Sequence, residues 1–194
     1  MDELNEVLMQ DSLQRTLDSI LAENHKVLQA VDRAAIAQFI ASITQSKRIF
    51  VTGEGRSGLV MRMFAMRLVH LDYQDFVVGE TITPAIQNGD LLIDCSGSGS
   101  TGNVLAIAQK AQATGAQIVS ITTQPDSPLG QLADIMIHLN AAAKQDRTQQ
   151  HSQQFAGSLF EQSALLLLDA VFHLIVKQTN QSAETLYSLH ANLE

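Results

Sequence analysis

Cysteine, proline and clustered basic residues are scarce in this 194-residue chain, which has one cysteine, three prolines and no basic run longer than Lys47-Arg48. A single thiol, Cys95, cannot form an internal disulfide, so a reducing compartment is the simpler expectation. Eleven glycines and three prolines make up only about 7% of the chain, which excludes a collagen-like or low-complexity protein. With 45% hydrophobic residues, the chain is expected to form one compact domain over residues 1–194.

The chain also lacks a basic surface signature and a long hydrophobic run. Its net charge is −8 and its pI is near 5.1, which disfavours a nucleic-acid partner. The longest apolar runs, such as residues 164–168, are far too short to cross a bilayer. The first 20 residues carry acids and periodic leucines instead of a basic start and an apolar core. We therefore expect no signal peptide or membrane anchor, no membrane partner and a cytoplasmic location.

Two amphipathic helices are predicted before residue 46. Between residues 4 and 31, aliphatic residues recur at spacings of three, four and seven, the pattern of a long helix with one apolar stripe. Asp32 fits the N-cap of a second helix, whose apolar residues end near Gln45. We predict that residues 1–45 form N-terminal helices and that residues 46–194 form an α/β core with C-terminal helices.

From residue 48 onward, short β-rich runs alternate with helical stretches. This alternation is typical of a doubly wound α/β core with a parallel sheet. The predicted strands are residues 49–51, 76–78, 91–93, 118–121 and 135–137. The predicted helices are residues 58–71, 101–114, 129–133, 158–177 and 183–189. The glutamine-rich segment 141–158 has no periodicity and is interpreted as a mobile loop.

Two loops rich in glycine and hydroxyl groups join predicted strands to predicted helices. The first is GEGRSG at residues 53–58, and the second is SGSGSTG at residues 96–102. In a parallel sheet such loops lie at the carboxyl ends of the strands, where ligands bind if the strand order reverses between them. Glycines allow close approach, hydroxyls donate hydrogen bonds, and the following helix N-terminus adds roughly half a positive charge. This combination favours a phosphate monoester.

Other readings of these loops remain open from the residues alone. Either loop by itself is equally well explained as an ordinary turn. Gly53, Gly55 and Gly58 formally match the dinucleotide-binding pattern G-x-G-x-x-G. The acid expected about 20 residues later is approximated only by Asp72 or Asp75, which precede the strand at 76–78 instead of following it. A Walker A loop is excluded because no Gly-Lys-Ser/Thr follows a glycine at the required spacing.

At these motifs the sequence resembles the sugar isomerase (SIS) domain family and, within it, the 6-phospho-3-hexuloisomerases. The segments that carry the resemblance are GEGRSG (53–58), FAMRLVHL (64–71), VVGETITPAI (77–86), GDLLIDCSGSGST (89–101), SLFEQSALLLLDA (158–170) and HANLE (190–194). The resemblance implies a three-layer αβα sandwich with a five-stranded parallel sheet, flavodoxin-like, with the N-terminal helices packed alongside. It further implies a homo-oligomer, a tetramer, that uses no metal or organic cofactor.

The activity that the resemblance implies is the interconversion of D-arabino-hex-3-ulose 6-phosphate and D-fructose 6-phosphate through an enediolate, as in the ribulose monophosphate pathway of formaldehyde fixation. Such a reaction needs a base for a carbon-bound proton, a stabilised enediolate and a proton carrier for the oxygens. Two other functions are kept open. One is isomerisation of another sugar phosphate, and the other is non-catalytic binding of a sugar phosphate by a regulator, although residues 1–45 lack a helix-turn-helix signature.

The resemblance assigns Glu161 as the catalytic base and His190, from a neighbouring subunit, as the proton carrier that also opens the sugar ring. Arg56 would hold the enediolate oxygen or a sugar hydroxyl, and His70 is a further catalytic candidate. Each residue also has a plain structural explanation. Glu161 would complement a helix dipole, His190 would be a solvated tail residue, Arg56 would form a surface ion pair and His70 would pack in a core or interface.

The substrate-binding residues follow from the same motifs. The phosphate is assigned to the hydroxyl loop, and the sugar to the first loop and to Glu80, which is otherwise a loop charge. The predicted phosphate ligands are Ser96, Ser98, Ser100 and Thr101, and the predicted sugar-side residues are Gly53, Gly55, Ser57 and Glu80. The histidines show no metal-ligand spacing, so no metal site is predicted.

Overall fold

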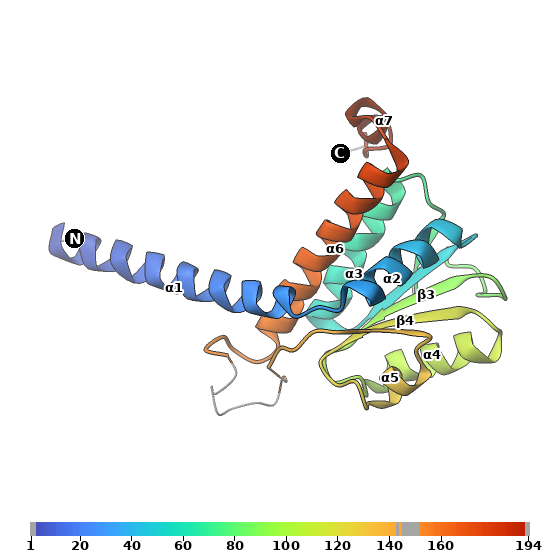
Figure 1. Ribbon diagram of the computed structural model, residues 1–194, viewed down its shortest axis with the longest axis horizontal. Helices are drawn as coiled ribbons and strands as arrows, with labels where there is room; N and C mark the ends of the chain where they lie inside the picture. Colours follow the sequence, from blue (N-terminus) through green and yellow to red (C-terminus); the bar gives the residue numbers. More distant parts are fainter. Residues whose placement is uncertain (1–2, 143, 145–151, 193–194) are drawn as a thin grey trace.

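A computed structural model describes residues 3–142, 144 and 152–192, with side chains from residue 9 onward. The first helix, α1 (Glu3–Gln29), and the second, α2 (Arg33–Gln45), match the predicted helices closely. Asp32 is the N-cap of α2, because its carboxylate accepts a hydrogen bond from the backbone N–H of Ala34 at 2.8 Å. Figure 1 shows that α1 projects from the body of the protein, and its C-terminal part packs against the rest. Val27 and Leu28 join the core there, and Asn24 forms hydrogen bonds with Gln162 and Ser163 of α6.

Five parallel strands form the sheet: β1 (Ile49–Gly53), β2 (Asp75–Val77), β3 (Leu91–Cys95), β4 (Gln117–Thr122) and β5 (Ile135–His138). Their spatial order is β2-β1-β3-β4-β5. The order reverses between β1 and β3, which is the switch point where doubly wound sheets bind ligands. The predicted fold class is confirmed, and each predicted strand overlaps an observed one.

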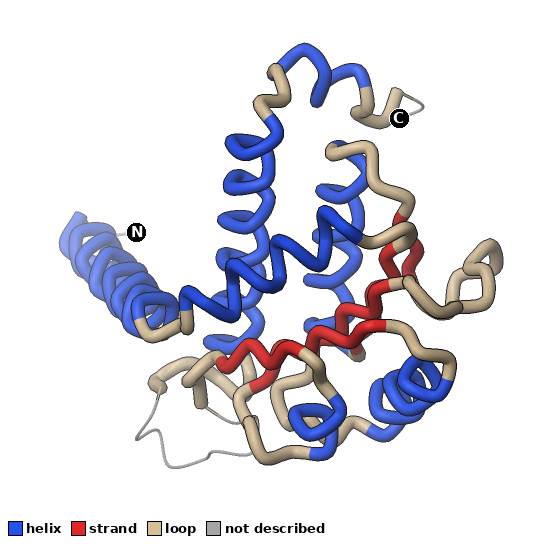
Figure 2. The backbone as a smooth tube through the Cα atoms, turned by 45° about the vertical axis from the view of Figure 1, so that its right-hand side comes forward, coloured by secondary structure: helices blue, strands red, loops and turns tan. Residues whose placement is uncertain are grey.

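Helices cover both faces of this sheet (Figure 2). One face carries α2, α3 (Gly55–His70) and α6 (Ser158–Thr179), and the other carries α4 (Gly102–Ala113) and α5 (Pro128–Leu132). The short helix α7 (Ala183–Ser188) follows α6. The start of α3 was predicted at residue 58, but the helix begins three residues earlier, so the first glycine loop supplies its opening turn.

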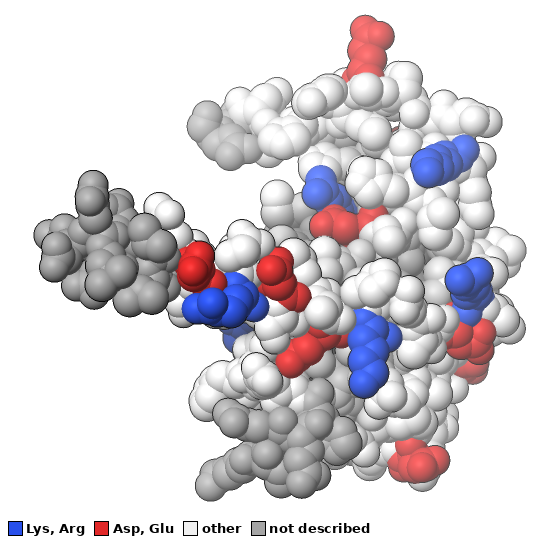
Figure 3. Space-filling view, turned by 60° about the vertical axis from the view of Figure 1, so that its left-hand side comes forward, with Lys and Arg blue, Asp and Glu red and all other residues white. Residues whose placement is uncertain are grey.

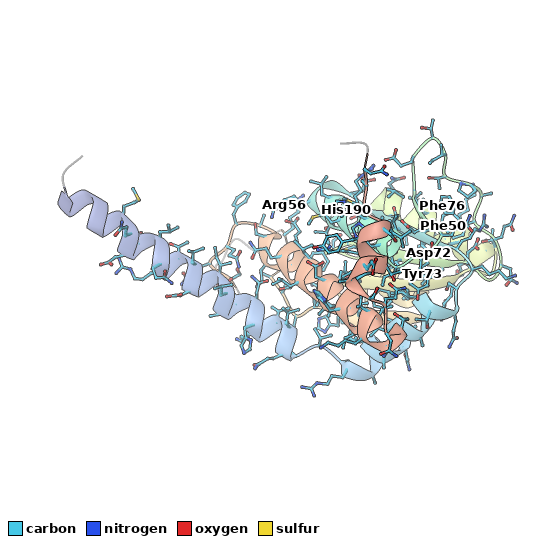
Figure 4. The ribbon with its side chains drawn as sticks, turned by 90° about the horizontal axis from the view of Figure 1, so that it is seen from above. Phe50, Arg56, Asp72, Tyr73, Phe76 and His190 are labelled. Atoms are coloured by element: carbon cyan, nitrogen blue, oxygen red, sulfur yellow. The ribbon has the colours of Figure 1, made fainter. Side chains whose placement is uncertain are left out.

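Two apolar clusters hold the layers together. The larger one joins the sheet to α2, α3 and α6 and contains buried rings such as Phe39 and Phe64, whose centroids lie 6.2 Å apart. The smaller one lies under α4 and α5, and Figure 4 shows Phe50 beside Phe76, stacked at 5.3 Å. In the described part of the chain, α6 alone is long and apolar enough to cross a membrane, and 50% of that apolar window is buried, as expected of a core helix.

In the segment 141–158, predicted to be a mobile loop, residues 143 and 145–151 lie outside the described residues, which resume at residue 152. Residues 152–154 are attached to α1. The carboxylate of Glu23 accepts hydrogen bonds from the Ser152 hydroxyl, the Gln153 backbone N–H and the Gln154 side-chain amide at 2.7–2.9 Å. These bonds fix the chain just before α6 begins.

Candidate active site

The two glycine loops meet at the carboxyl edge of the sheet because β1 and β3 are neighbours and Gly53 pairs with Cys95. The first loop is tight. A Cβ atom added to Gly58 would lie 2.6 Å from the Gly53 carbonyl oxygen, and one added to Gly53 would lie 3.0 Å from the Cys95 carbonyl oxygen. Side chains at these positions would push the loops apart. Between the loops and α6 lies a cleft of about 330 Å³.

The second loop has the form expected of a phosphate site. The hydroxyls of Ser96 and Thr101 lie 2.9 Å apart, and that of Ser98 lies 3.5 Å from Thr101. These three residues line the cleft, whereas Ser100 is exposed beside it. Gly99 has a φ of +59°, and a Cβ atom there would lie 1.9 Å from the Ser127 hydroxyl oxygen, so this turn requires glycine.

Three helix N-termini point into the cleft, and they explain how an acidic chain can hold an anion. The helices α3, α4 and α6 begin there, and none of their N-cap side chains makes a capping hydrogen bond. The first backbone N–H groups of α3 and α4 are therefore left for a ligand, whereas the Ser158 N–H of α6 donates to the Phe155 carbonyl oxygen at 3.2 Å. Each helix still contributes roughly half a positive charge. Lys144 adds a cation at the rim. On the face drawn in Figure 3, basic and acidic side chains are interspersed, with no continuous basic patch.

An acid and a base from distant parts of the sequence meet at the cleft. Glu161, in the first turn of α6, forms an ion pair with Arg56, in the first turn of α3. The Glu161 side chain is only 15% exposed, while that of Arg56 is 64% exposed. Burial raises the pKa of the Cys95 thiol, which lies at the base of the cleft, so this group stays protonated at neutral pH. The Glu161 side chain therefore lines the cleft in which an anion is expected, and its ion-pair partner Arg56 lies beside it.

The two predicted catalytic histidines lie elsewhere in the chain. The rings of His70 and His190 stack at 5.2 Å and 12°, next to a second cavity of about 210 Å³ that also contains the Arg67–Asp169 ion pair. Burial, with the charges of His190 and Arg67, lowers the pKa of His70. Arg56 and His70 are 14 residues apart on α3, about 21 Å along the axis, so one chain does not bring these histidines to Glu161.

The remaining predicted residues divide in the same way. Gly55 and Ser57 line the cleft, and Gly53 forms the turn beneath it. Glu80 does not line the cleft of its own chain. It forms an ion pair with Arg62 on the exposed side of α3. A dinucleotide site would need an acidic residue at the carboxyl end of β2 to bind the ribose. Asp75 instead begins β2 and therefore lies at the opposite edge of the sheet.

Sequence reasoning missed several residues of the cleft. Lys144 lies in the segment without periodicity, and Phe160 looked like any apolar residue of a helix. The Phe160 ring packs on the second loop, 3.2 Å from where a Cβ atom of Gly97 would be. Glu54 also lines the cleft, and its carboxylate accepts a hydrogen bond from the Asn103 side chain at 2.6 Å. Of these residues, Gly97 and Glu54 gave a signal, since they lie within the second and first glycine loops.

Comparisons with known proteins agree with this geometry. The SIS domain family matches residues 42–173. The chain is 45% identical to the 3-hexulose-6-phosphate isomerase of Mycobacterium gastri over 95% of this chain and 92% of that protein. It is 38% identical to the Bacillus subtilis enzyme of the same name over 90% and 95%. A crystal structure from Methanococcus jannaschii, from which a 3-hexulose-6-phosphate isomerase function was inferred, superposes with a TM-score of 0.81 at 34% identity over 93% of this chain and 99% of that one. The chain belongs to the SIS domain family.

Proposed function

We propose that this protein is a 3-hexulose-6-phosphate isomerase, which interconverts D-arabino-hex-3-ulose 6-phosphate and D-fructose 6-phosphate. The observation that carries the proposal is the cleft itself, where three helix N-termini and a hydroxyl loop face the Glu161–Arg56 pair. The relatives of that name at 38–45% identity support the same substrate. A cytoplasmic location, with the whole chain acting as one SIS domain, belongs to the same proposal.

The reaction needs one proton to move between neighbouring carbons, and the cleft offers a carboxylate for it. With the phosphate on Ser96, Ser98 and Thr101, Glu161 removes the C2 proton of the 3-ulose and leaves an enediolate across C2 and C3. Returning the proton to C3 places the carbonyl at C2, which gives fructose 6-phosphate. Arg56 and the N-terminal N–H groups of α3 stabilise the negative charge on the enediolate oxygens.

A proton must also move between the two oxygens, and we assign this step to His190 of a neighbouring subunit. His190 stacks on His70 at the end of α3 far from Glu161 of the same chain, which favours delivery to another copy. We propose a homo-oligomer, a tetramer, in which His70 and Glu80 also reach a neighbouring cleft. An uncovered apolar surface on α3 and α6 supports this assembly. Its exposed side chains are Leu59, Met63, Met66, Val69, Leu166 and Leu174.

The test is a coupled assay with purified protein and a panel of hexulose, pentose and heptose phosphates. We expect turnover of the hexulose pair, and Glu161→Gln should lower kcat by about 10²–10⁴-fold while fructose 6-phosphate still binds. Asp11→Asn, an equal change of charge on the projecting part of α1, should keep wild-type activity. Full activity in Glu161→Gln would reject the base, and turnover of only another sugar phosphate would reject the substrate.

A further inference from the structure

The cleft contains a second carboxylate, Glu54, that the proposed chemistry does not use. Glu54 follows Gly53 at the end of β1, and Ser96 follows Cys95 at the end of β3, so the paired strands place Glu54 beside the start of the phosphate loop. Its carboxylate is held there by the side-chain amide of Asn103, in the first turn of α4, at 2.6 Å. This hydrogen bond joins the first loop to the helix that follows the second.

The charge of Glu54 is unusual for a phosphate site. Among the residues that the structure describes, the four ion pairs all use other carboxylates, and the Glu54 side chain makes no capping hydrogen bond to α3. A negative charge next to the phosphate loop repels a phosphate, so Glu54 weakens the binding of a bare anion. A contact with another part of the ligand would offset this repulsion, and the position of Glu54 in the lining of the cleft allows one.

A sugar phosphate offers such a part. When its phosphate lies on Ser96, Ser98 and Thr101 and its reacting carbons lie at Glu161, the hydroxyls at C4 and C5 must span the distance between them. Glu54 lines the same cleft, beside the start of the phosphate loop, so we expect its carboxylate to be within reach of these hydroxyls. A carboxylate only accepts hydrogen bonds, and its two oxygens match two hydroxyl donors on neighbouring carbons.

We propose that Glu54, positioned by Asn103, recognises the hydroxyls between the phosphate and the carbonyl and so selects polyhydroxylated phosphate esters over simple ones. This inference rests on the proposed function for the orientation of the ligand. It makes Glu54 a specificity residue whose carboxylate favours the sugar and disfavours the phosphate in the same site.

Opposite effects on two ligands test this inference. Calorimetric titration would measure the affinities of fructose 6-phosphate and of butyl phosphate, which carries the same phosphate without hydroxyls. We expect Glu54→Gln to weaken fructose 6-phosphate binding about tenfold, since each hydrogen bond to a charged group is lost or weakened, and to strengthen butyl phosphate binding. Asp11→Asn, with the same change of net charge, should alter neither affinity.

A second variant separates the effect of the negative charge at position 54 from the effect of the side-chain length. Glu54→Asp keeps the negative charge on a shorter side chain, so fructose 6-phosphate should bind more weakly while butyl phosphate binds as in the wild type. Equal weakening of both ligands in Glu54→Gln would mean that the loop has collapsed, and unchanged fructose 6-phosphate binding would mean that Glu54 does not contact the sugar. Either result overturns the inference. A wild type that binds fructose 6-phosphate without isomerising it would instead reject the proposed function alone.

Discussion

The buried carboxyl of Asp94 predicts a specific dependence of stability on pH. Asp94 lies in β3 with an exposed fraction of 0%, between Thr52 of β1 and Ser120 of β4. One of its oxygens accepts a hydrogen bond from the Ser120 hydroxyl at 2.6 Å, and the other is buried without a partner in the described residues. Burial raises the pKa of Asp94 from 3.8 to about 7, against the smaller lowering effect of Ser120.

The sign of the effect follows from proton linkage. Below about pH 4 the carboxyl is protonated in both the folded and the unfolded chain. Between pH 4 and 7 the unfolded carboxyl ionises while Asp94 in the folded chain keeps its proton, so the free energy of unfolding falls as the pH rises. At about 1.4 kcal/mol for each tenfold difference in proton affinity, the full loss above pH 7 is about 4 kcal/mol.

The variant Asp94→Asn has nearly the same shape and cannot ionise. Urea unfolding of both proteins would give the difference in their free energies of unfolding at each pH. That difference should grow in favour of Asp94→Asn by about 2 kcal/mol between about pH 5.5 and 8.5, on top of any constant offset from the new amide. Asp11→Asn, which removes an exposed carboxyl, should follow the wild-type curve. A difference that stays constant over this range would refute a protonated Asp94 in the folded protein.

Two further predictions concern the cleft and the assembly. Gly58→Ala should lower the free energy of unfolding by about 1–3 kcal/mol, because the added Cβ atom would lie 2.6 Å from the Gly53 carbonyl oxygen. Gly102→Ala is the control, since its added Cβ atom would have no atom within 4 Å and should not destabilise the protein. Urea unfolding of the two variants and the wild type measures both effects. Mixing inactive Glu161→Gln and His190→Gln subunits should restore about a quarter of the wild-type sites, because hybrid pairs form one intact cleft when each site uses residues of two chains. A mixture that stays inactive after subunit exchange would place both residues in one chain.

The sequence predicted the fold because the relevant signals are local. Each strand of the sheet is a short apolar run, and each covering helix repeats its apolar residues with a helical period. The start of α3 was placed too late for the same reason. Gly55 and Gly58 carry no side chains that a period could count, whereas their close approach to the backbone of the first loop determines where the helix begins.

The site was predictable only in its loops. The hydroxyl loop is contiguous, so its four phosphate ligands were predicted together. In the structure Ser96, Ser98 and Thr101 line the cleft and Ser100 is exposed beside them, and their contact with the phosphate stays a prediction. The Arg56–Glu161 pair spans 105 positions, and its partners meet because two helix N-termini converge. The hydrophobic periodicity of a sequence predicts which residues are buried, but it does not predict which helix ends face each other. The pairing of Arg56 with Glu161 could therefore not be predicted from it.

Convergence of helix ends also explains why this site suits an isomerase of phosphorylated sugars in an acidic chain. Backbone dipoles, with Lys144 at the rim, attract the anion, so Arg56 is left to pair with Glu161 and to meet the charge that develops during enolisation. Among the described residues that line the cleft of one chain, there is no histidine to exchange protons between the two oxygens. The stacked His70 and His190, at the far end of α3 beside an uncovered apolar surface, are the groups that a second copy would supply. On this view oligomerisation completes the active site.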